Sequence, residues 1–339
     1  MIPIDKEYSP PSSLKSQIRQ YQNLAKEVEN YLKSKPYEWG KFQSIFNYEV
    51  NGVFRQIMEF EKNNFKSYQE EKVYKLKKIF INRIRHHFLH GEYIVWSLKK
   101  PLGYAGDYKI IDQIYLNQPK TVGFERLFDN YFQMSSISVA VRNRKDDFKR
   151  FILEFINKNP EKKLRILDLG SGPCRELFEL FSNDLSDSSQ LFVDCLDNDQ
   201  SALNYAKSML DGFPNITFTK ENAVRFALKK NIAQTIGKQY NLIYSTGLFD
   251  YFDDRLIIRL LQNLKSLLSN DGVLAVADVR DKYSNASVHF MEWVGDWNLI
   301  YRDDENFRQL FLEAGFRSEN LAIGYEQQGT MQYIFARNS

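Results

Sequence analysis

Residues 164–176 read Leu-Arg-Ile-Leu-Asp-Leu-Gly-Ser-Gly-Pro-Cys-Arg-Glu, an apolar run that ends in a loop of small residues. The run predicts a buried strand, and the residues after the loop predict the start of a helix. Gly170 and Gly172 permit backbone angles and a close ligand approach that a Cβ would block, while the helix start offers unpaired N–H groups. The stretch is typical of a nucleotide-binding turn.

The glycine spacing argues against a dinucleotide as the ligand. A dinucleotide fingerprint requires Gly-x-Gly-x-x-Gly, so that a helix N-terminus can meet a pyrophosphate. Arg175 occupies the sixth position of this loop. The loop therefore suits a nucleoside better than a diphosphate.

A second strand and an acidic residue follow along the chain. Residues 191–196 form another apolar run, and Asp197 comes directly after it. A carboxylate at this place can accept both hydroxyl groups of a ribose. Apolar residues then recur at helical spacing, at Ala202, Leu203, Ala206 and Met209. The order of strand, glycine loop, helix, strand, acid and helix is half of a doubly wound sheet.

Later runs complete the predicted sheet. Residues 241–247 and 272–278 are continuous apolar runs of the kind found in buried parallel strands. Residues 320–325 and 331–337 flank a short Glu-Gln-Gln-Gly-Thr segment, which predicts a hairpin and an antiparallel edge. We expect an α/β fold with a Rossmann-like, seven-stranded, mostly parallel sheet whose last strand is antiparallel.

These motifs resemble those of class I S-adenosylmethionine-dependent methyltransferases. The resemblance implies that the first loop wraps the methionine part of S-adenosylmethionine, that Asp197 holds the ribose and that Asn222 contacts the adenine amino group. The residues at the end of the fourth predicted strand are further cofactor candidates. The full set implied is Asp168, Gly170, Ser171, Gly172, Pro173, Asp197, Asn198, Asn222, Ala223, Ser245, Thr246 and Gly247.

The N-terminal part of the chain has a different character. Apolar residues recur every three or four positions between residues 14 and 31, 42 and 57, and 73 and 88, which predicts helices. The chain is 15% aromatic, and many of the rings fall at this spacing, so we read them as a packed core rather than a stacking platform for bases. We expect an all-helical domain over residues 1–135, acting as a cap, and a methyltransferase domain over residues 136–339.

Composition and charge set limits on location and partners. The two cysteines, Cys174 and Cys195, match no disulfide or zinc spacing, and no signal peptide or membrane-spanning apolar run is present. We expect a soluble, cytoplasmic protein that is not integral to a membrane. Residues 1–150 hold 26 Lys and Arg against 17 Asp and Glu. We favour a solvated helical face over an acidic or nucleic-acid partner, because the lysines alternate with glutamates.

A loop within the helical region supports a narrower resemblance. Residues 101–108 read Pro-Leu-Gly-Tyr-Ala-Gly-Asp-Tyr, which must interrupt a helix and is either a tight connector or a functional loop. Together with residues 138–144 and 246–252, this segment is similar to bacterial proteins of 3-hydroxypalmitic acid methyl ester biosynthesis. That resemblance implies O-methylation of a small, fatty-acid-like carboxylate.

The chemistry of a carboxylate acceptor agrees with this implication. A carboxylic acid is ionised at neutral pH and needs no general base, whereas an alcohol or a phenol usually needs a base or a metal. His86 and His90 have the i, i+4 spacing of two metal ligands, but a third ligand and the usual Glu are missing. We expect a structural or surface histidine pair and no metal.

Several residues are candidates for the acceptor site. An arginine can bind a carboxylate through two hydrogen bonds. The apolar segment 288–301 either forms a wall for an acyl chain or packs as core. The candidates are Tyr104, Asp107, Arg142, Arg144, Tyr251, Arg280, His289, Trp297 and Tyr301.

Two other classes of function stay open. The basic N-terminal half favours an RNA or protein acceptor, which would give salt-sensitive binding if the acceptor is a nucleic acid. The lack of an identifiable base favours a non-catalytic module that only senses S-adenosylmethionine. The Asn/Asp-Pro-Pro-Tyr/Phe motif of enzymes that methylate adenine or glutamine is absent after residue 244, which argues against those acceptors.

Overall fold

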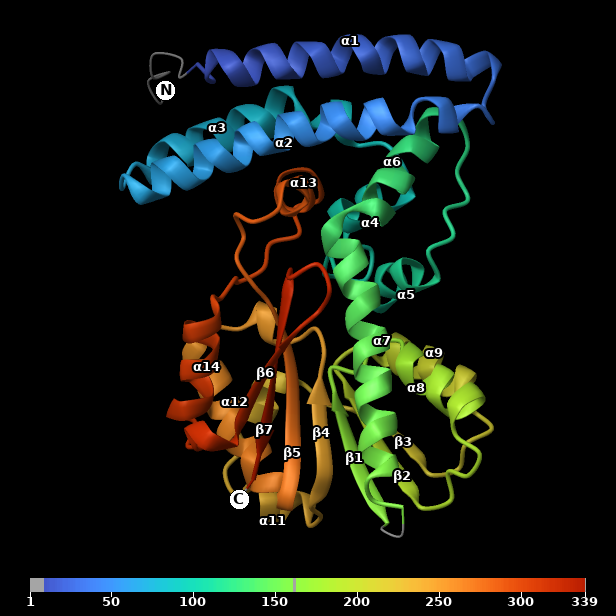
Figure 1. The fold of residues 1–339 in the computed structure, drawn as a ribbon, viewed down its shortest axis with the longest axis vertical. Coiled ribbons are helices and arrows are strands. Elements are labelled where there is room, and N and C mark those ends of the chain that lie inside the picture. Colours follow the sequence, from blue (N-terminus) through green and yellow to red (C-terminus); the bar gives the residue numbers. More distant parts are fainter. Residues whose placement is uncertain (1–8, 161–162, 339) are drawn as a thin grey trace. The chain divides into compact units, whose positions relative to one another are not determined.

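The computed structural model describes residues 9–160 and 163–338, and Figure 1 labels their helices and strands. The chain divides into two compact units. One, the helical unit, contains the described residues up to Ile110, together with Leu116–Val139 and Lys282–Asn298. The other, the sheet unit, contains Ile111–Tyr115, the described residues of Ala140–Asp281 and those from Leu299 onward.

Most of the helical unit consists of amphipathic helices that follow the predicted periodicity. Its core is aromatic: the rings of Tyr21 and Phe88 stack with centroids 4.3 Å apart, and Phe46 meets Phe128 edge-on at 4.8 Å. Its helices are α1 (Ser12–Ser34), η1 (Trp39–Lys41), α2 (Gln43–Lys66), α3 (Glu70–Arg83), η2 (Arg85–Phe88), α4 (Glu92–Lys99), the ends of α5 (Tyr108–Leu116), and α6 (Gly123–Met134).

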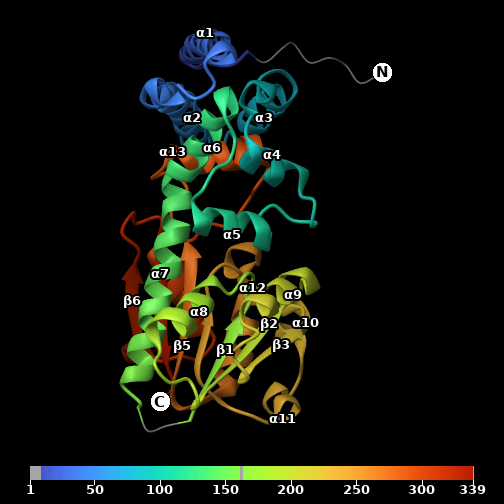
Figure 2. The same cartoon turned by 90° about the vertical axis from the view of Figure 1, so that its right-hand side faces the viewer.

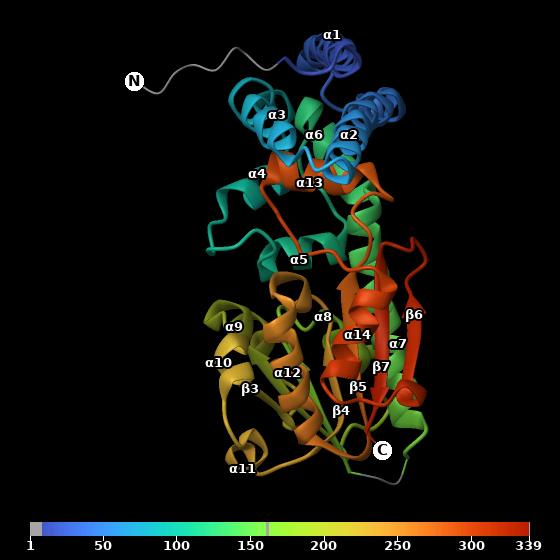
Figure 3. The same cartoon turned by 90° about the vertical axis from the view of Figure 1, so that its left-hand side faces the viewer.

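A helix from the C-terminal half also belongs to this unit. Helix α13 (Ala286–Gly295) contacts α2, α3 and α4, as Figure 3 shows. Phe290 packs edge-on against Phe54 at 5.2 Å, and Trp293 packs against Phe80 at 5.5 Å. Every residue from Ser287 to Gly295 is buried. The apolar segment around α13 therefore packs as core of the helical unit.

The sheet unit is built on seven strands in the order β3-β2-β1-β4-β5-β7-β6. The first five are parallel, and β7 is antiparallel to both of its neighbours. The predicted fold class is confirmed, although the antiparallel strand lies second from the edge because β6 flanks it. The strands are β1 (Leu164–Leu169), β2 (Leu191–Asp197), β3 (Ile216–Lys220), β4 (Tyr240–Ser245), β5 (Leu268–Val279), β6 (Leu321–Tyr325) and β7 (Met331–Arg337).

Helices cover both faces of this sheet. Figures 2 and 3 show α7 (Ser136–Asn157) on one face and α12 (Asp254–Leu267) on the other. Side chains alternate along each strand, so that Tyr244 faces Phe148 of α7 while Ile243 joins the core beneath α12. The remaining helices are α8 (Arg175–Glu179), η3 (Leu180–Asp184), α9 (Gln200–Met209), α10 (Ala223–Leu228), α11 (Ile232–Ile236), η4 (Phe249–Tyr251), α14 (Asp304–Glu313) and η5 (Ser318–Asn320).

Candidate active site

The glycine loop after β1 has the geometry that its residue types require. The N–H groups of Gly170 and Ser171 donate to the carbonyl of Leu196 at 2.8 and 3.1 Å, which anchors the start of the loop to the end of β2. Gly170 and Gly172 have φ values of +72° and +52°, a region that residues with a Cβ rarely adopt. A Cβ on Gly170 would also lie 3.2 Å from the Leu248 side chain.

The same loop leaves room and a hydrogen-bonding group for a ligand. A Cβ built on Gly172 would meet nothing within 4 Å. The hydroxyl of Ser171 is buried and has no hydrogen-bond partner among residues 9–160 and 163–338. A buried hydroxyl without a partner is costly, so its presence beside an open cradle fits a bound polar group. These residues suit the methionine part of S-adenosylmethionine.

Asp197 at the end of β2 connects this loop to the next one. Its Oδ2 accepts a hydrogen bond from Gly172 N and its Oδ1 accepts one from Asp199 N, both at 2.8 Å. Burial raises the pKa of Asp197. A carboxylate has about four acceptor sites, so two remain for the hydroxyl groups of a ribose.

The amides expected to meet the adenine lie at the ends of neighbouring strands. Asn222 follows β3 and caps α10, because its Oδ1 accepts a hydrogen bond from Arg225 N at 3.0 Å. Its Nδ2 donates to Asn198 Oδ1 at 3.3 Å, and Ala223 begins the capped helix. The structure thus brings Asn198, Asn222 and Ala223 together, and their contact with adenine stays a prediction.

Asp168 lies beneath the loop, in a buried polar cluster. The Cys174 Sγ donates a hydrogen bond to Asp168 Oδ2 at 3.9 Å. A carboxylate oxygen of Asp168 and the Sγ atoms of Cys174 and Cys195 all lie within 4.8 Å of one another. Burial raises the pKa of Asp168 well above its usual range. The hydrogen bond with Cys195 and burial likewise raise the pKa of Cys174. The loop therefore rests on a buried, hydrogen-bonded cluster of polar side chains.

The end of β4 carries a second close approach. Ser245 is buried, and its hydroxyl donates to the Leu169 carbonyl at 2.7 Å, which ties β4 to β1. Two residues on, a Cβ on Gly247 would lie 3.1 Å from the terminal nitrogens of Arg144. Thr246 joins these two positions. The guanidinium of Arg144 therefore lies against the backbone where the fourth strand ends.

Arg144 is unusual among the predicted acceptor residues. Its side chain is 5% exposed, and its Nε has no hydrogen-bond partner in the described chain. The guanidinium is hydrogen-bonded to the Tyr115 hydroxyl, and the charge of Asp250 is near it. Such a buried arginine with an unused N–H group is suited to binding a carboxylate.

Two carboxyl groups meet at the ends of β4 and β5. Asp250 Oδ1 accepts a hydrogen bond from Val279 N at 2.8 Å, and the buried carboxyl group of Asp278 lies close to Asp250. Burial and the proximity of Asp250 raise the pKa of Asp278 well above its usual range. Arg302 lies 3.5 Å from Asp278 Oδ1 and donates to the Phe252 carbonyl at 2.6 Å. This acid pair stabilises the loop that follows β4.

The other predicted acceptor residues of the sheet unit have varied surroundings. Arg280 forms a two-pronged pair with Asp304, at 2.8 and 3.0 Å, so its guanidinium is already occupied. Arg142 donates to the Ile114 carbonyl at 3.4 Å. Tyr251 is 39% exposed on the loop after β4, and Tyr301 is half-buried before α14. Their contact with an acceptor stays a prediction.

Four predicted acceptor residues belong to the helical unit instead. Asp107 caps the start of α5 by accepting from Lys109 N and Ile110 N, and it accepts from Trp96 Nε1 at 2.7 Å. Tyr104 lies in the preceding turn and is 36% exposed. Trp297 and His289 are buried. The unusual segment 101–108 thus begins a helix.

The predicted histidine pair also lies in the helical unit. Helix α3 ends at Arg83, so His86 and His90 do not share an α-helical face. His90 Nδ1 lies 2.9 Å from Glu125 Oε1. The His90 side chain therefore contacts Glu125 of α6 within the helical unit.

His289 is part of a buried charge cluster. Lys282 Nζ lies 2.6 Å from both Glu61 Oε1 and Glu292 Oε2, and His289 Nε2 lies 3.7 Å from Glu61 Oε2. Trp293 Nε1 donates to Glu61 at 3.2 Å. Although burial alone would raise it, the His289 and Lys282 side chains lower the pKa of Glu61 to about 2. The cluster connects α2 to α13.

We expect the Glu61→Gln substitution to lower the free energy of unfolding of the helical unit, and to lower it more at neutral pH than at acidic pH. A carboxyl whose pKa falls from about 4.3 unfolded to about 2 folded contributes about 3 kcal/mol above pH 4.3, and loses it as the pH falls toward 2. All four tryptophans lie in the helical unit, so their fluorescence in urea follows this unit. The difference in free energy of unfolding between the natural protein and the variant should shrink from pH 7 to pH 3. A difference that stays constant with pH would contradict the lowered pKa of Glu61.

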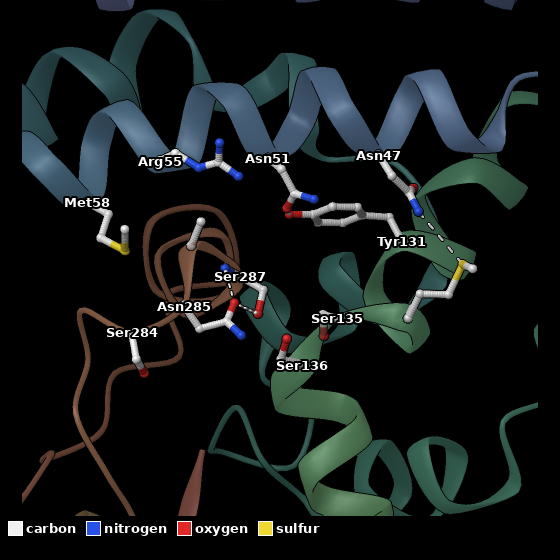
Figure 4. Close-up of a pocket in the computed structure, with 12 residues that line it drawn as sticks. Asn47, Asn51, Arg55, Met58, Tyr131, Ser135, Ser136, Ser284, Asn285 and Ser287 are labelled. Atoms are coloured by element: carbon white, nitrogen blue, oxygen red, sulfur yellow. Dashed lines mark hydrogen bonds between the residues drawn. The ribbon is translucent and has the colours of Figure 1, made fainter. Parts of the chain in front are cut away.

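A polar cavity of about 270 Å³ lies within the helical unit, between α2, the α6–α7 corner and the start of α13. Figure 4 shows Tyr131 beside Asn51, and the Tyr131 hydroxyl donates a hydrogen bond to Asn51 Oδ1 at 2.9 Å. Arg55 lies on the same helix as Asn51. Its lining holds amides, hydroxyls and one guanidinium but no carboxylate in the described residues. The cavity contains none of the acceptor residues predicted from the sequence.

Sequence reasoning missed residues that contact the site from a distance along the chain. Asp112 pairs with Arg175, and Tyr115 contacts Arg144. Glu176 accepts from the Tyr244 hydroxyl at 3.0 Å beneath the glycine loop. A lone acid within the apolar stretch of α5, and an arginine in place of the third glycine, are the signals that could have found the first pair.

The sheet, the glycine loop and the acid after β2 define a Rossmann-like protein that binds a nucleoside-containing ligand. Residues 160–338 match a family model described as a methyltransferase domain, and the chain belongs to this family. It is a methyltransferase that uses S-adenosylmethionine, in agreement with the cofactor predicted from the sequence. No curated protein matches the chain.

Several solved structures are similar to this chain at low sequence identity. A "possible exported protein" from Bordetella parapertussis is 15% identical, with 99% of both chains covered and a TM-score of 0.56. The CurJ carbon methyltransferase is 11% identical, with 95% of this chain and 70% of that chain covered and a TM-score of 0.51. Magnesium protoporphyrin IX methyltransferase from Synechocystis PCC 6803 is 11% identical, with 60% and 84% covered and a TM-score of 0.43.

Membrane insertion through a helix finds no support in the described residues. Across 9–160 and 163–338, none of the helices combines the length and the apolar character that crossing a bilayer requires.

Proposed function

We propose that the chain transfers a methyl group from S-adenosylmethionine to the carboxylate oxygen of a small, lipophilic acid. When bound, the donor supplies a methyl group activated by a sulfonium. Arg144 is the observation that carries the proposal, because a buried guanidinium with an unpartnered Nε lies against Gly247 at the carboxyl end of β4. Ligands of open α/β sheets bind at this end of the strands.

The residues around Arg144 suit an acceptor that is already ionised. In-line transfer needs mainly alignment of donor and acceptor at near-contact distance, which a two-pronged arginine–carboxylate pair provides. Asp250, whose charge acts on Arg144, accepts a hydrogen bond from Val279 N at 2.8 Å and lies close to the buried Asp278. A carboxylate acceptor would leave that pair in its structural role.

The proposed acid is of the fatty-acid class. The resemblance of residues 101–108 to the 3-hydroxypalmitic acid methyl ester family supports a lipophilic chain on the acceptor. The partly exposed Tyr251 follows Gly247 on the same loop and offers apolar surface there. A cytoplasmic location remains part of this proposal, and fractionation of cells would test it.

A panel of acceptors tests the proposal directly. Fatty acids, 3-hydroxy fatty acids, their methyl esters, phenols, peptides and RNA would each be incubated with S-adenosylmethionine, and release of S-adenosylhomocysteine measured. We expect turnover with the free acids and none with the matching methyl esters, in which the carboxylate is blocked. Turnover only with phenols, peptides or RNA would overturn the proposal, and no turnover with any acceptor would favour a sensing module.

A further inference from the structure

A short piece of α5 belongs to the sheet unit rather than to the helical unit. Residues Ile111–Tyr115 group with the sheet unit, whereas Ile110 and Leu116 on either side of them group with the helices. Each of Asp112, Ile114 and Tyr115 contacts a residue of the sheet unit.

Asp112 makes the strongest of these contacts. Arg175 donates to it from two nitrogens, with Nε to Oδ1 and a terminal nitrogen to Oδ2 both at 2.8 Å. The Tyr205 hydroxyl donates to the same carboxylate at 2.6 Å and accepts from Arg175 at 3.1 Å. Asp112 is 3% exposed. The side chains of Arg175 and Tyr205 therefore form a closed, partly buried network around the buried Asp112 carboxylate.

The position of Arg175 gives this network its meaning. Arg175 is the first residue of α8 and directly follows Cys174, which ends the glycine loop with a φ of +50°. The loop receives S-adenosylmethionine, whose sulfonium is a cation. An unpaired guanidinium beside this loop would repel that charge, and water screens such repulsion poorly when the groups are buried.

Tyr115 extends the same surface toward the acceptor side. Its hydroxyl is hydrogen-bonded to the Arg144 guanidinium, and burial raises the pKa of Tyr115 to about 12. The charges of Glu176 and Asp168 also act on this hydroxyl. One five-residue segment thus contacts both arginines that lie at the ends of β1 and β4.

We propose that Ile111–Tyr115 is a third segment of the methyl-donor site and that Asp112 is a positioning residue within it. By pairing with Arg175, Asp112 neutralises the cation next to the glycine loop and so lets the site accept the sulfonium of S-adenosylmethionine. The product S-adenosylhomocysteine has a neutral thioether, so its binding depends less on this charge. The proposal rests on the methyltransferase assignment but not on the identity of the acceptor.

Calorimetric titration of the full chain with S-adenosylmethionine and with S-adenosylhomocysteine tests this idea without an acceptor. The variants are Asp112→Asn, Arg175→Gln and the double variant. The double variant removes both charges, so the pair stays neutral overall, and it keeps polar side chains of similar shape. Asp211→Asn is the matched control, because Asp211 is exposed after the end of α9, away from the strand end that carries Asp197.

For Asp112→Asn we expect about tenfold weaker binding of S-adenosylmethionine, with S-adenosylhomocysteine changed by less than about threefold. Arg175→Gln should shift the ratio of the two affinities in the opposite direction. The double variant should return the ratio to that of the natural protein, even if both affinities fall. A ratio that stays constant across all variants would mean that the network is only structural and would overturn the proposal.

The test does not depend on every variant folding. If Asp112→Asn does not fold, which circular dichroism would show, the ratios for Arg175→Gln and the double variant still decide the question. An unchanged ratio in those two proteins would count against the proposal in the same way. A failure of the acceptor panel would leave these donor affinities unaffected, so the two proposals fail separately.

Discussion

Replacing Asp197 by alanine is expected to weaken binding of S-adenosylmethionine about 100-fold. The carboxylate accepts hydrogen bonds from Gly172 N and Asp199 N, and it is placed to accept the ribose hydroxyls as well. Hydrogen bonds to a charged group contribute about 1.5–3 kcal/mol each, so the loss of two reaches this size. Isothermal titration of the purified protein measures the change.

Controls separate the ribose contact from the shape of the loop. Asp197→Asn keeps one acceptor oxygen and should lose less affinity than the alanine variant. Asp187→Asn changes the same charge at an exposed position and should bind like the natural protein. If Asp197→Ala bound S-adenosylmethionine with unchanged affinity, the ribose role of this residue would be wrong.

Replacing Arg144 by glutamine is expected to lower kcat/KM for a carboxylate acceptor about 1000-fold. Two charge-assisted hydrogen bonds to the acceptor would be lost, which corresponds to about 4 kcal/mol. The dissociation constant of S-adenosylhomocysteine should change by less than about threefold. Steady-state kinetics with the best acid of the panel, together with titration of the cofactor product, gives both numbers.

The same helix offers a matched control for this variant. Arg150 also lies on α7, but it is 61% exposed and pairs with Asp147 on the surface. Arg150→Gln should leave both constants unchanged, and Arg144→Lys should retain part of the activity because it keeps the charge without the two-pronged geometry. If Arg144→Gln weakened binding of S-adenosylhomocysteine as much as it lowered kcat/KM for the acceptor, the guanidinium would bind the cofactor. The proposed role of Arg144 in binding the acceptor would then be wrong.

Several parts of the site follow from local sequence signals. The glycine loop and the acid after β2 could be predicted because a positive φ needs glycine, and because the loop and β2 are neighbours in any doubly wound sheet. The strands around them were predicted because a buried parallel strand is apolar along its whole length. Each of these features depends on residues that are close in the sequence or on a register that the fold class imposes.

Contacts between distant segments escaped the sequence analysis. The segment around helix α13 is rich in large apolar residues, which predicts burial but not a partner, and the structure packs α13 against α2, α3 and α4. The hairpin of β6 and β7 was predicted, yet only the sheet order places β7 inside and β6 at the edge. In each case the residue pattern is compatible with more than one neighbour.

Residues 164–176 show which features are local and which depend on the tertiary structure. By itself the sequence determined that residues 164–176 form a strand, a glycine loop and a helix start, because backbone angles and apolar runs are local properties. Only the tertiary structure decided that Arg175, which first appears as a missing glycine, is neutralised by Asp112. That pairing joins residues 63 positions apart, and its energy depends on burial and on the approach of two helices, which no local pattern specifies.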